Sequence, residues 1–198
     1  MEERKALALF DFDGTLTRKD TLFEMALFDK GWIAFIWGMF ILLPQFLLYY
    51  LGQINAQKLK EKYLQHFFKN RDLDNWNDTC EKFSEKVLPG LIRKNALDCL
   101  LKHKSENARI LVVTASCENW VSPWCRKLGI ECISSEMEVF NNRITGSLLG
   151  PNCNGIEKVN RIRQYLKIET YSPIFAYGDT KGDYEMLKLA DHAFLKSF

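Results

Sequence analysis

Short apolar runs alternate with amphipathic segments along most of this chain. Apolar runs predict buried strands near residues 6–12, 109–115 and 174–178, with a last strand from His192 to Leu195. Apolar residues at helical spacing predict helices near residues 91–104, 119–128 and 156–166. Strands that alternate with helices are typical of an α/β fold, a Rossmann-like parallel sheet with helices on both faces. Segments near 130–140 and 143–146, joined at Asn141-Asn142, predict a hairpin.

Residues 18–88 interrupt the alternation, because they show helical periodicity and no clear strand. The stretches 56–69 and 75–87 mix apolar and charged residues at helical spacing, and Pro89-Gly90 marks the return to strands. We therefore predict an α/β core of residues 1–17 and 89–198 with an inserted all-helical cap of residues 18–88.

Within the expected cap, residues 32–51 carry no charge and are long enough to span a bilayer. Gly38 and Pro44 predict a break into two helical pieces, an apolar hairpin. A single span conflicts with the chemistry below, because Asp11 precedes the segment while Thr114 follows it. Both must meet on one side of any membrane.

Two interpretations of residues 32–51 stay open. The first is a hairpin buried in the cap or in a contact between two copies of the chain. The second is a re-entrant or interfacial hairpin that dips into lipid, where aromatic residues suit the interface and lysines attract anionic head groups. The segment and its sequel supply both kinds of residue: Trp32, Trp37, Tyr49, Tyr50, Lys58, Lys60 and Lys62.

Composition narrows the class of protein. The chain has 198 residues, 47% of them apolar, which is enough for a buried core. Its net charge of +2 is too balanced to favour nucleic acid as a partner. Its six cysteines lack metal-ligand spacing, and we expect reduced thiols. With no secretory signal before the first strand, we expect a cytoplasmic protein, or one held peripherally at the inner face of the membrane.

The strongest chemical signal stands at the end of the first predicted strand, which runs into Asp11, Asp13 and Gly14. Because alternate strand residues point to the same side, we expect Asp11 and Asp13 to crowd one site. Carboxylates that close repel each other unless a cation or a shared proton relieves them. The pair suits a divalent metal ion with a carboxylate nucleophile. A strand end with a solvated turn would show the same pattern.

Two further segments suit a phosphoryl ligand. The second strand ends at Thr114, Ala115 and Ser116, where a hydroxyl and free backbone N–H groups can hold phosphoryl oxygens. Ser116 would also serve as the cap of the next helix. Lys158 lies in the first turn of a predicted helix, where a cation opposes the helix dipole. An anionic ligand would explain that placement, and an ordinary surface lysine is the alternative.

A third strand ends in Gly178-Asp179, and Asp183 follows four residues later. The glycines of this segment permit tight turns. Groups at the carboxyl ends of parallel strands lie where α/β sheets bind their ligands. A polar loop with a capping aspartate is the alternative.

Taken in order, these four segments resemble the four motifs of the haloacid dehalogenase-like superfamily over nearly the whole chain. The resemblance is closest to the phosphoserine phosphatase-like branch, in which helices inserted after the first motif form a cap. Residues 134–138 and 143–146 resemble the connecting hairpin of that branch. The chain is also similar to the bacterial phosphatidylglycerophosphatases of the same branch, which act on a lipid phosphomonoester.

The resemblance implies a Mg²⁺-dependent phosphatase that forms an aspartyl phosphate. Asp11 would attack phosphorus, while Asp13 would protonate the leaving alcohol and then activate water. Mg²⁺ would bind Asp11, the backbone carbonyl of Asp13, and Asp179, a sparse oxygen set that suits this ion.

The remaining motif residues would bind the substrate or support the site. Thr114 and Lys158 would hold phosphoryl oxygens, with Ala115 and Ser116 beside them. Asp183 would support the metal shell and orient Lys158, and Gly178 of the same motif would be a further supporting residue.

The expected substrate is a lipid phosphomonoester such as phosphatidylglycerophosphate. Asp20 stands where phosphoserine phosphatases usually place a substrate-binding glutamate, so it is either a substrate contact or only a helix N-cap. A soluble phosphatase for phosphoserine or a related metabolite is the alternative. A phosphotransferase, or a binding protein without catalysis, would use the same fold.

Overall fold

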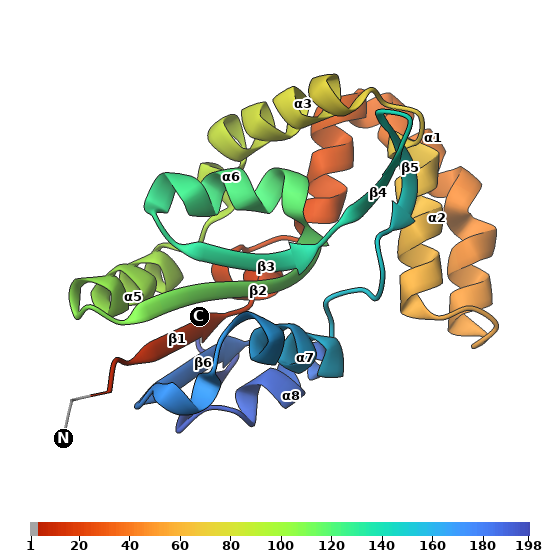
Figure 1. Cartoon of the computed structure of the whole chain (residues 1–198). Helices are drawn as coiled ribbons and strands as arrows, with labels where there is room; N and C mark the ends of the chain where they lie inside the picture. The colour runs from red at the N-terminus through yellow and green to blue at the C-terminus, as the bar shows by residue number, and fades with distance from the viewer. Residues whose placement is uncertain (1–3) are drawn as a thin grey trace.

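Five parallel strands form the central sheet of the computed structural model, which describes residues 4–198 (Figure 1). From edge to edge they are β3 (Glu131–Ser135), β2 (Arg109–Cys117), β1 (Leu7–Phe10), β6 (Ile174–Gly178) and β7 (His192–Leu195). Every neighbouring pair in this sheet is parallel. The predicted α/β fold with a Rossmann-like parallel sheet is confirmed.

Helices cover both faces of the sheet, because alternate residues of β1 point into two separate cores. Ala8 and Phe10 pack in the core shared with α5 (Lys94–Ser105) and α6 (Glu118–Leu128). Leu7 and Leu9 pack in the core shared with α7 (Ile156–Tyr165) and α8 (Tyr184–Leu187). Since β1 is fully buried, its carboxyl end is a rigid support for whatever follows it.

The main helices begin and end within three residues of their predicted bounds. A short helix, α4 (Leu88–Leu91), precedes α5. Before it, residues 18–88 form α1 (Thr21–Tyr50), α2 (Ala56–Phe68) and α3 (Leu73–Lys86). Figure 1 shows α1 and α2 beyond the carboxyl ends of β2 and β3.

The prediction for residues 130–140 was wrong in part. Its first half is β3, which joins the central sheet, and only β4 (Met137–Phe140) pairs with β5 (Arg143–Leu148) as a hairpin. The register of β3 is set by β2, where Val113 pairs with Ile133. Partners so distant in sequence are not visible in a local pattern. The turn at Asn141-Asn142 is as expected, with φ of 48° and 58°.

The expected break within residues 32–51 was also wrong. The helix α1 continues through Gly38 and Pro44, and its backbone departs from helical angles at Gly31, where φ is 76°. Gly38 serves close packing instead, because a Cβ there would lie 2.4 Å from the Phe67 ring of α2. Proline inside a helix costs a backbone hydrogen bond but need not end the helix. The apolar segment is therefore one helix that packs against α2.

Candidate active site

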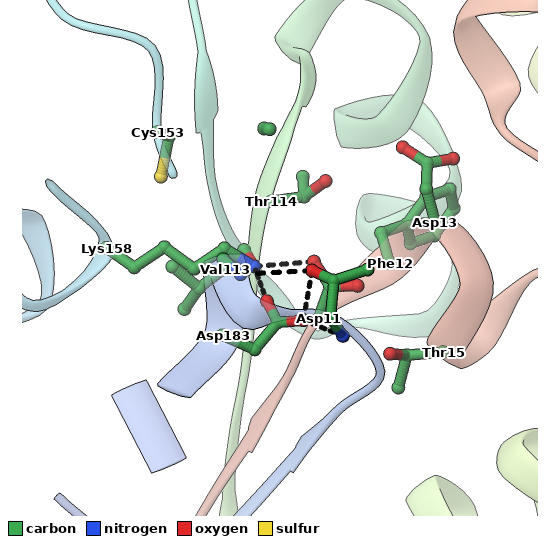
Figure 2. A network of polar contacts seen from close by, with 12 residues as sticks. Asp11, Phe12, Asp13, Thr15, Val113, Thr114, Cys153, Lys158 and Asp183 are labelled. Carbon is green, nitrogen blue, oxygen red and sulfur yellow. Dashed lines mark hydrogen bonds and ion pairs between the residues drawn. The ribbon is translucent and has the colours of Figure 1, made fainter. Parts of the chain in front are cut away.

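The carboxyl ends of β1, β2 and β6 meet at one edge of the sheet, and the predicted site residues gather there (Figure 2). Asp11 directly follows β1, Thr114 lies in the last part of β2, and Asp179 directly follows β6. Lys158 reaches the same point from the first turn of α7. The structure thus brings together side chains from four segments that are distant in sequence.

Lys158 is the centre of this cluster. Its Nζ lies 2.5 Å from Oδ1 of Asp11, 2.7 Å from Oδ1 of Asp183 and 2.7 Å from the carbonyl oxygen of Val113. The lysine side chain is only 1% exposed. Burial alone would lower the pKa of Lys158, but the neighbouring carboxylates outweigh it and raise the pKa. Lys158 is therefore a buried permanent cation and not an ordinary surface lysine.

Asp11 and Asp183 respond differently to the same lysine. Burial raises the pKa of Asp11 to about 7, against the opposing charge of Lys158. Burial also acts on Asp183, but Lys158 and two backbone N–H groups lower the pKa of this carboxyl. Those N–H groups belong to Asp179 and Thr180, at 3.1 and 2.9 Å from Oδ2. Asp183 is thus a fixed anion that holds Lys158 and the loop after β6 in place.

A cation fits beside these carboxylates. Oxygen atoms of Asp11, Asp179 and Asp183 lie within 4.8 Å of one another. Burial and the charge of Asp183 raise the pKa of Asp179, whose Oδ1 accepts a 3.4 Å hydrogen bond from Thr15. Gly14 keeps this space open, because a Cβ there would lie 2.3 Å from Oδ2 of Asp179. Crowded carboxylate oxygens of this kind suit a hard divalent ion.

We expected Asp13 to crowd Asp11, but the structure places the two carboxylates apart. Figure 2 shows its carboxylate pointing away from the lysine cluster. The reason is local, because β1 ends at Phe10 and a helical turn, Phe12–Leu16, follows. The alternation of a strand therefore does not apply at Asp13.

The carboxylate of Asp13 is held by the start of α1 and by the end of β2. Its Oδ1 accepts a 2.8 Å hydrogen bond from the Thr21 N–H, and Oδ2 accepts one from the Ser116 hydroxyl. Burial raises the pKa of Asp13 despite these hydrogen bonds. Ser116 is not the predicted helix cap, because α6 begins after Cys117 and has no side-chain cap. The serine hydroxyl instead positions Asp13.

Thr114 and Ala115 directly precede Ser116 in β2. Thr114 is buried, and its hydroxyl oxygen accepts a 3.0 Å hydrogen bond from the Ser116 N–H. Ala115 is half-buried, and its carbonyl oxygen accepts a hydrogen bond from Lys60 of α2. Gly178 is the last residue of β6, and a Cβ on it would lie 2.5 Å from Cβ of Asp183. Its hydrogen side chain is therefore needed for Asp183 to approach the strand.

Lys60 also reaches the end of β2, whereas the sequence analysis considered it only with Lys58 and Lys62 as a lysine that attracts anionic head groups. Its Nζ also donates to Oδ1 of Asn152 at 2.8 Å, and the side chain is half-buried. Lys60 lies on the same face of α2 as the buried residues Tyr63, Leu64 and Phe67, at helical spacing of three, four and seven. This helical spacing from buried apolar residues is the signal in the sequence that distinguishes Lys60 from Lys58 and Lys62.

Asp20 lies at the start of α1, and its carboxylate accepts a 2.8 Å hydrogen bond from the Leu22 N–H. The N-cap interpretation of Asp20 is therefore confirmed. The residue is exposed.

A match over most of the chain decides its family. A family model described as haloacid dehalogenase-like hydrolase matches residues 8–188. The chain belongs to this family. The predicted superfamily and the prediction of an enzyme, a hydrolase, are thereby confirmed.

Similar proteins agree with this assignment. Protein CicA of Caulobacter vibrioides is 34% identical over 197 residues, covering 96% of this chain and 86% of that protein. A Mycobacterium tuberculosis protein named "Probable phosphatase Rv3661" is 25% identical, covering 96% of this chain and 68% of that protein.

Solved structures share the fold. A protein with unknown function from Bordetella pertussis has a TM-score of 0.79 and 22% identity, covering 94% of this chain and 87% of that one. A substrate-bound phosphoserine phosphatase complex has a TM-score of 0.68 and 21% identity, covering 96% and 84%. The likeness to the phosphoserine phosphatase-like branch is confirmed at the level of fold. The similarity to phosphatidylglycerophosphatases stays a prediction.

Proposed function

We propose that this hydrolase is a phosphomonoester phosphatase that uses Mg²⁺ and an aspartyl phosphate on Asp11. The observation that carries the proposal is the buried contact between Asp11 and Lys158, 2.5 Å long, at the carboxyl end of β1. A carboxylate beside a permanent cation, with crowded acidic oxygens nearby, suits the in-line transfer of an anionic phosphoryl group. The names of the phosphatase relatives support the same chemistry.

Mg²⁺ would be held by the Asp11 and Asp179 carboxylates and by the backbone carbonyl of Asp13. The bound ion would supply positive charge to the phosphoryl oxygens and to the crowded carboxylates. Asp183 would support the site without binding the ion directly, since its oxygens already accept hydrogen bonds from Lys158 and from the loop after β6.

Each step is then assigned to side chains of this chain. A carboxylate oxygen of Asp11 forms a bond to phosphorus as the bond from phosphorus to the alcohol oxygen breaks. Asp13, whose pKa burial raises, gives its proton to that alcohol oxygen. Asp13 then takes a proton from water, and the hydroxide oxygen attacks phosphorus, which releases phosphate and restores Asp11. Thr114 and Lys158 would hold phosphoryl oxygens through both steps.

The proposed substrate is a lipid phosphomonoester such as phosphatidylglycerophosphate. Two features support it: the exposed apolar face of α1, which offers contact to a membrane surface, and Lys60, which adds positive charge beside the site. The enzyme would then work in the cytoplasm, peripherally at the inner face of the membrane. Phosphoserine is the second candidate, which the phosphoserine phosphatase neighbours support. We also propose that residues 18–88 act as the cap, because Lys60 reaches the site from them.

Phosphate release by purified protein tests the function. The assay compares phosphatidylglycerophosphate in mixed micelles, phosphoserine and a soluble aryl phosphate, each with Mg²⁺. We expect Asp11→Asn to lose nearly all turnover, while Asp78→Asn, an exposed carboxylate on α3, keeps it. Aryl phosphate turnover that persists in Asp11→Asn contradicts the aspartyl phosphate. Turnover of phosphoserine without turnover of the lipid contradicts the lipid substrate alone.

A further inference from the structure

The half of α1 that follows Gly31 presents large apolar side chains to solvent. Trp32, Ile33, Trp37 and Tyr50 are 64%, 76%, 65% and 87% exposed. By length and composition α1 could cross a membrane, yet only 11% of its most apolar window is buried within the protein. The interpretation of a segment buried in the cap was therefore wrong. A surface this apolar on a folded protein marks an interaction site.

Among the residues that the structure describes, a narrow strip of this half packs against the rest of the protein. Gly38 and Leu42 are buried, and the Phe35 ring stacks on Phe67 of α2 at 5.9 Å between centroids. The exposed residues on either side of the strip leave a wide apolar surface without any charge from Gly31 to Gln57. We call this surface the apolar face, and it consists of the exposed side chains of Trp32, Ile33, Trp37, Phe40, Ile41, Leu43, Leu47, Tyr49, Tyr50 and Leu51.

A row of basic residues runs beside the apolar face. Lys58, Lys62, His66 and Lys69 are exposed and lie at spacings of four, four and three along α2, which places them on one side of that helix. The row borders α1, since a Cβ on Gly38 would lie 2.8 Å from Nε2 of His66. From Gly31 to Lys69 the sequence contains one carboxylate, Glu61, which is half-buried and accepts hydrogen bonds from the Gln57 side chain and the Leu148 N–H. The combined surface is thus apolar and cationic.

Both ends of the exposed half are tied to the rest of the protein. Just before Gly31, Asp29 pairs with Arg71 at 2.7 Å. After the helix turns back into α2, Lys60 bonds Asn152 at 2.8 Å. A bilayer span would place these two ends on opposite sides of the membrane. The exposed half of α1 therefore cannot cross a bilayer while both contacts hold.

We propose that the apolar face and the basic row of α2 dock onto the surface of a bilayer rich in anionic lipid. Tryptophan and tyrosine favour the boundary between head groups and acyl chains, and lysines beside them attract anionic head groups. A second copy of the chain fits less well. In a two-fold contact the surface would face itself, and its exposed lysines would lie against a surface of the same charge. Charge complementarity selects the anionic membrane.

The docking rests on the peripheral membrane location in the proposed function and names its surface and its lipid, but it requires neither turnover nor a lipid substrate. It is tested by co-sedimentation of the full chain with phosphatidylcholine vesicles, with and without phosphatidylserine, which carries no phosphomonoester. We expect binding that requires phosphatidylserine. Replacing Trp37 and Ile41 by Glu should weaken it on the order of ten-fold or more. Lys58→Glu with Lys62→Glu should weaken it roughly five-fold per lysine.

Matched controls separate docking from folding and catalysis. Lys102→Glu with Lys127→Glu reverses two exposed lysines on α5 and α6, and should leave vesicle binding unchanged. All variants should keep wild-type turnover of a soluble aryl phosphate, which reports an intact site. Equal sedimentation of wild type and the Trp37 and Ile41 variant overturns the proposal. So does a lack of vesicle binding in a chain that light scattering shows to be a dimer. Failure of aryl phosphate turnover in wild type would contradict the proposed function and leave the vesicle result valid.

Discussion

The ammonium group of Lys158 lies 2.5 Å from Oδ1 of Asp11, and neither side chain is more than 9% exposed. A second buried carboxylate, Asp183, contacts the same ammonium group at 2.7 Å. Charges buried in this way depend on one another, since removal of one leaves the others uncompensated. Lys158 therefore has a structural role in addition to the role toward substrate that we propose for it.

Lys158→Met tests this dependence. The substitution leaves Asp11 and Asp183 buried without their cation, so we expect a loss of about 3–5 kcal/mol in the free energy of unfolding together with loss of turnover. Urea unfolding and phosphate release measure the two effects. The matched control is Lys102→Met on α5, whose side chain is 75% exposed. A Lys158→Met protein as stable as this control would show that the buried pair contributes nothing to the fold.

Metal binding should be visible as stability. The carboxylates of Asp11 and Asp179 crowd one another, so an ion that binds only the folded chain should stabilise it. We expect Mg²⁺ to raise the melting temperature of wild type, and a chelator to abolish turnover. Asp179→Asn should bind Mg²⁺ more weakly and lose most of this rise, whereas Asp78→Asn should keep it. A rise of the same size in Asp179→Asn would remove this residue from the metal site.

Lys60 should act on substrate choice and less on chemistry. Its Nζ adds positive charge beside the site, and Asn152 and the Ala115 carbonyl position it. We expect Lys60→Met to raise KM on the order of ten-fold for substrates with a second anionic group, with kcat on an aryl phosphate little changed. Lys60→Arg should restore part of the affinity. The control is Lys62→Met, on the exposed side of α2. A fall in kcat alone would place Lys60 in the chemical step.

Local sequence pattern was sufficient for four of the five strands of the sheet and for the main helices, and with the family resemblance it brought Asp11, Lys158, Asp179 and Asp183 to one site. Each of these residues directly follows a strand or opens a helix, so the topology of a parallel sheet brings them together. The expectation for Asp13 failed because the strand ends before it, and strand ends are set by neighbouring strands.

The other wrong predictions have the same cause, which is contact between residues that are distant along the chain. Gly38 looked like a helix breaker, but its lack of a side chain serves the contact with Phe67. The role of Lys60 depends on which face of α2 meets the core, and β3 depends on its pairing with β2. Such partners are decided by tertiary packing.

The burial of His103 predicts that stability depends on pH for a reason unrelated to the active site. This residue of α5 is 8% exposed, and its Nε2 lies 2.9 Å from the hydroxyl oxygen of Tyr177. Burial lowers the pKa of His103. The negative charge of Glu106 opposes this shift, and the positive charge of Lys102 adds to it. The unfolded chain therefore binds a proton at a pH where the folded chain does not. By linkage, the free energy of unfolding should rise with pH through the ordinary histidine range, about pH 5 to 7.

His103→Gln should remove this contribution while it keeps a hydrogen-bonding group for Tyr177. We expect urea unfolding at several pH values to show a shallower rise in this variant between about pH 5 and 7. The slope lost is at most about 1.4 kcal/mol per pH unit, the limit for one proton. His66→Gln, at an exposed position on α2, is the control and should keep the wild-type slope. An unchanged slope in His103→Gln would mean that the folded chain holds the proton on His103 as readily as the unfolded chain does.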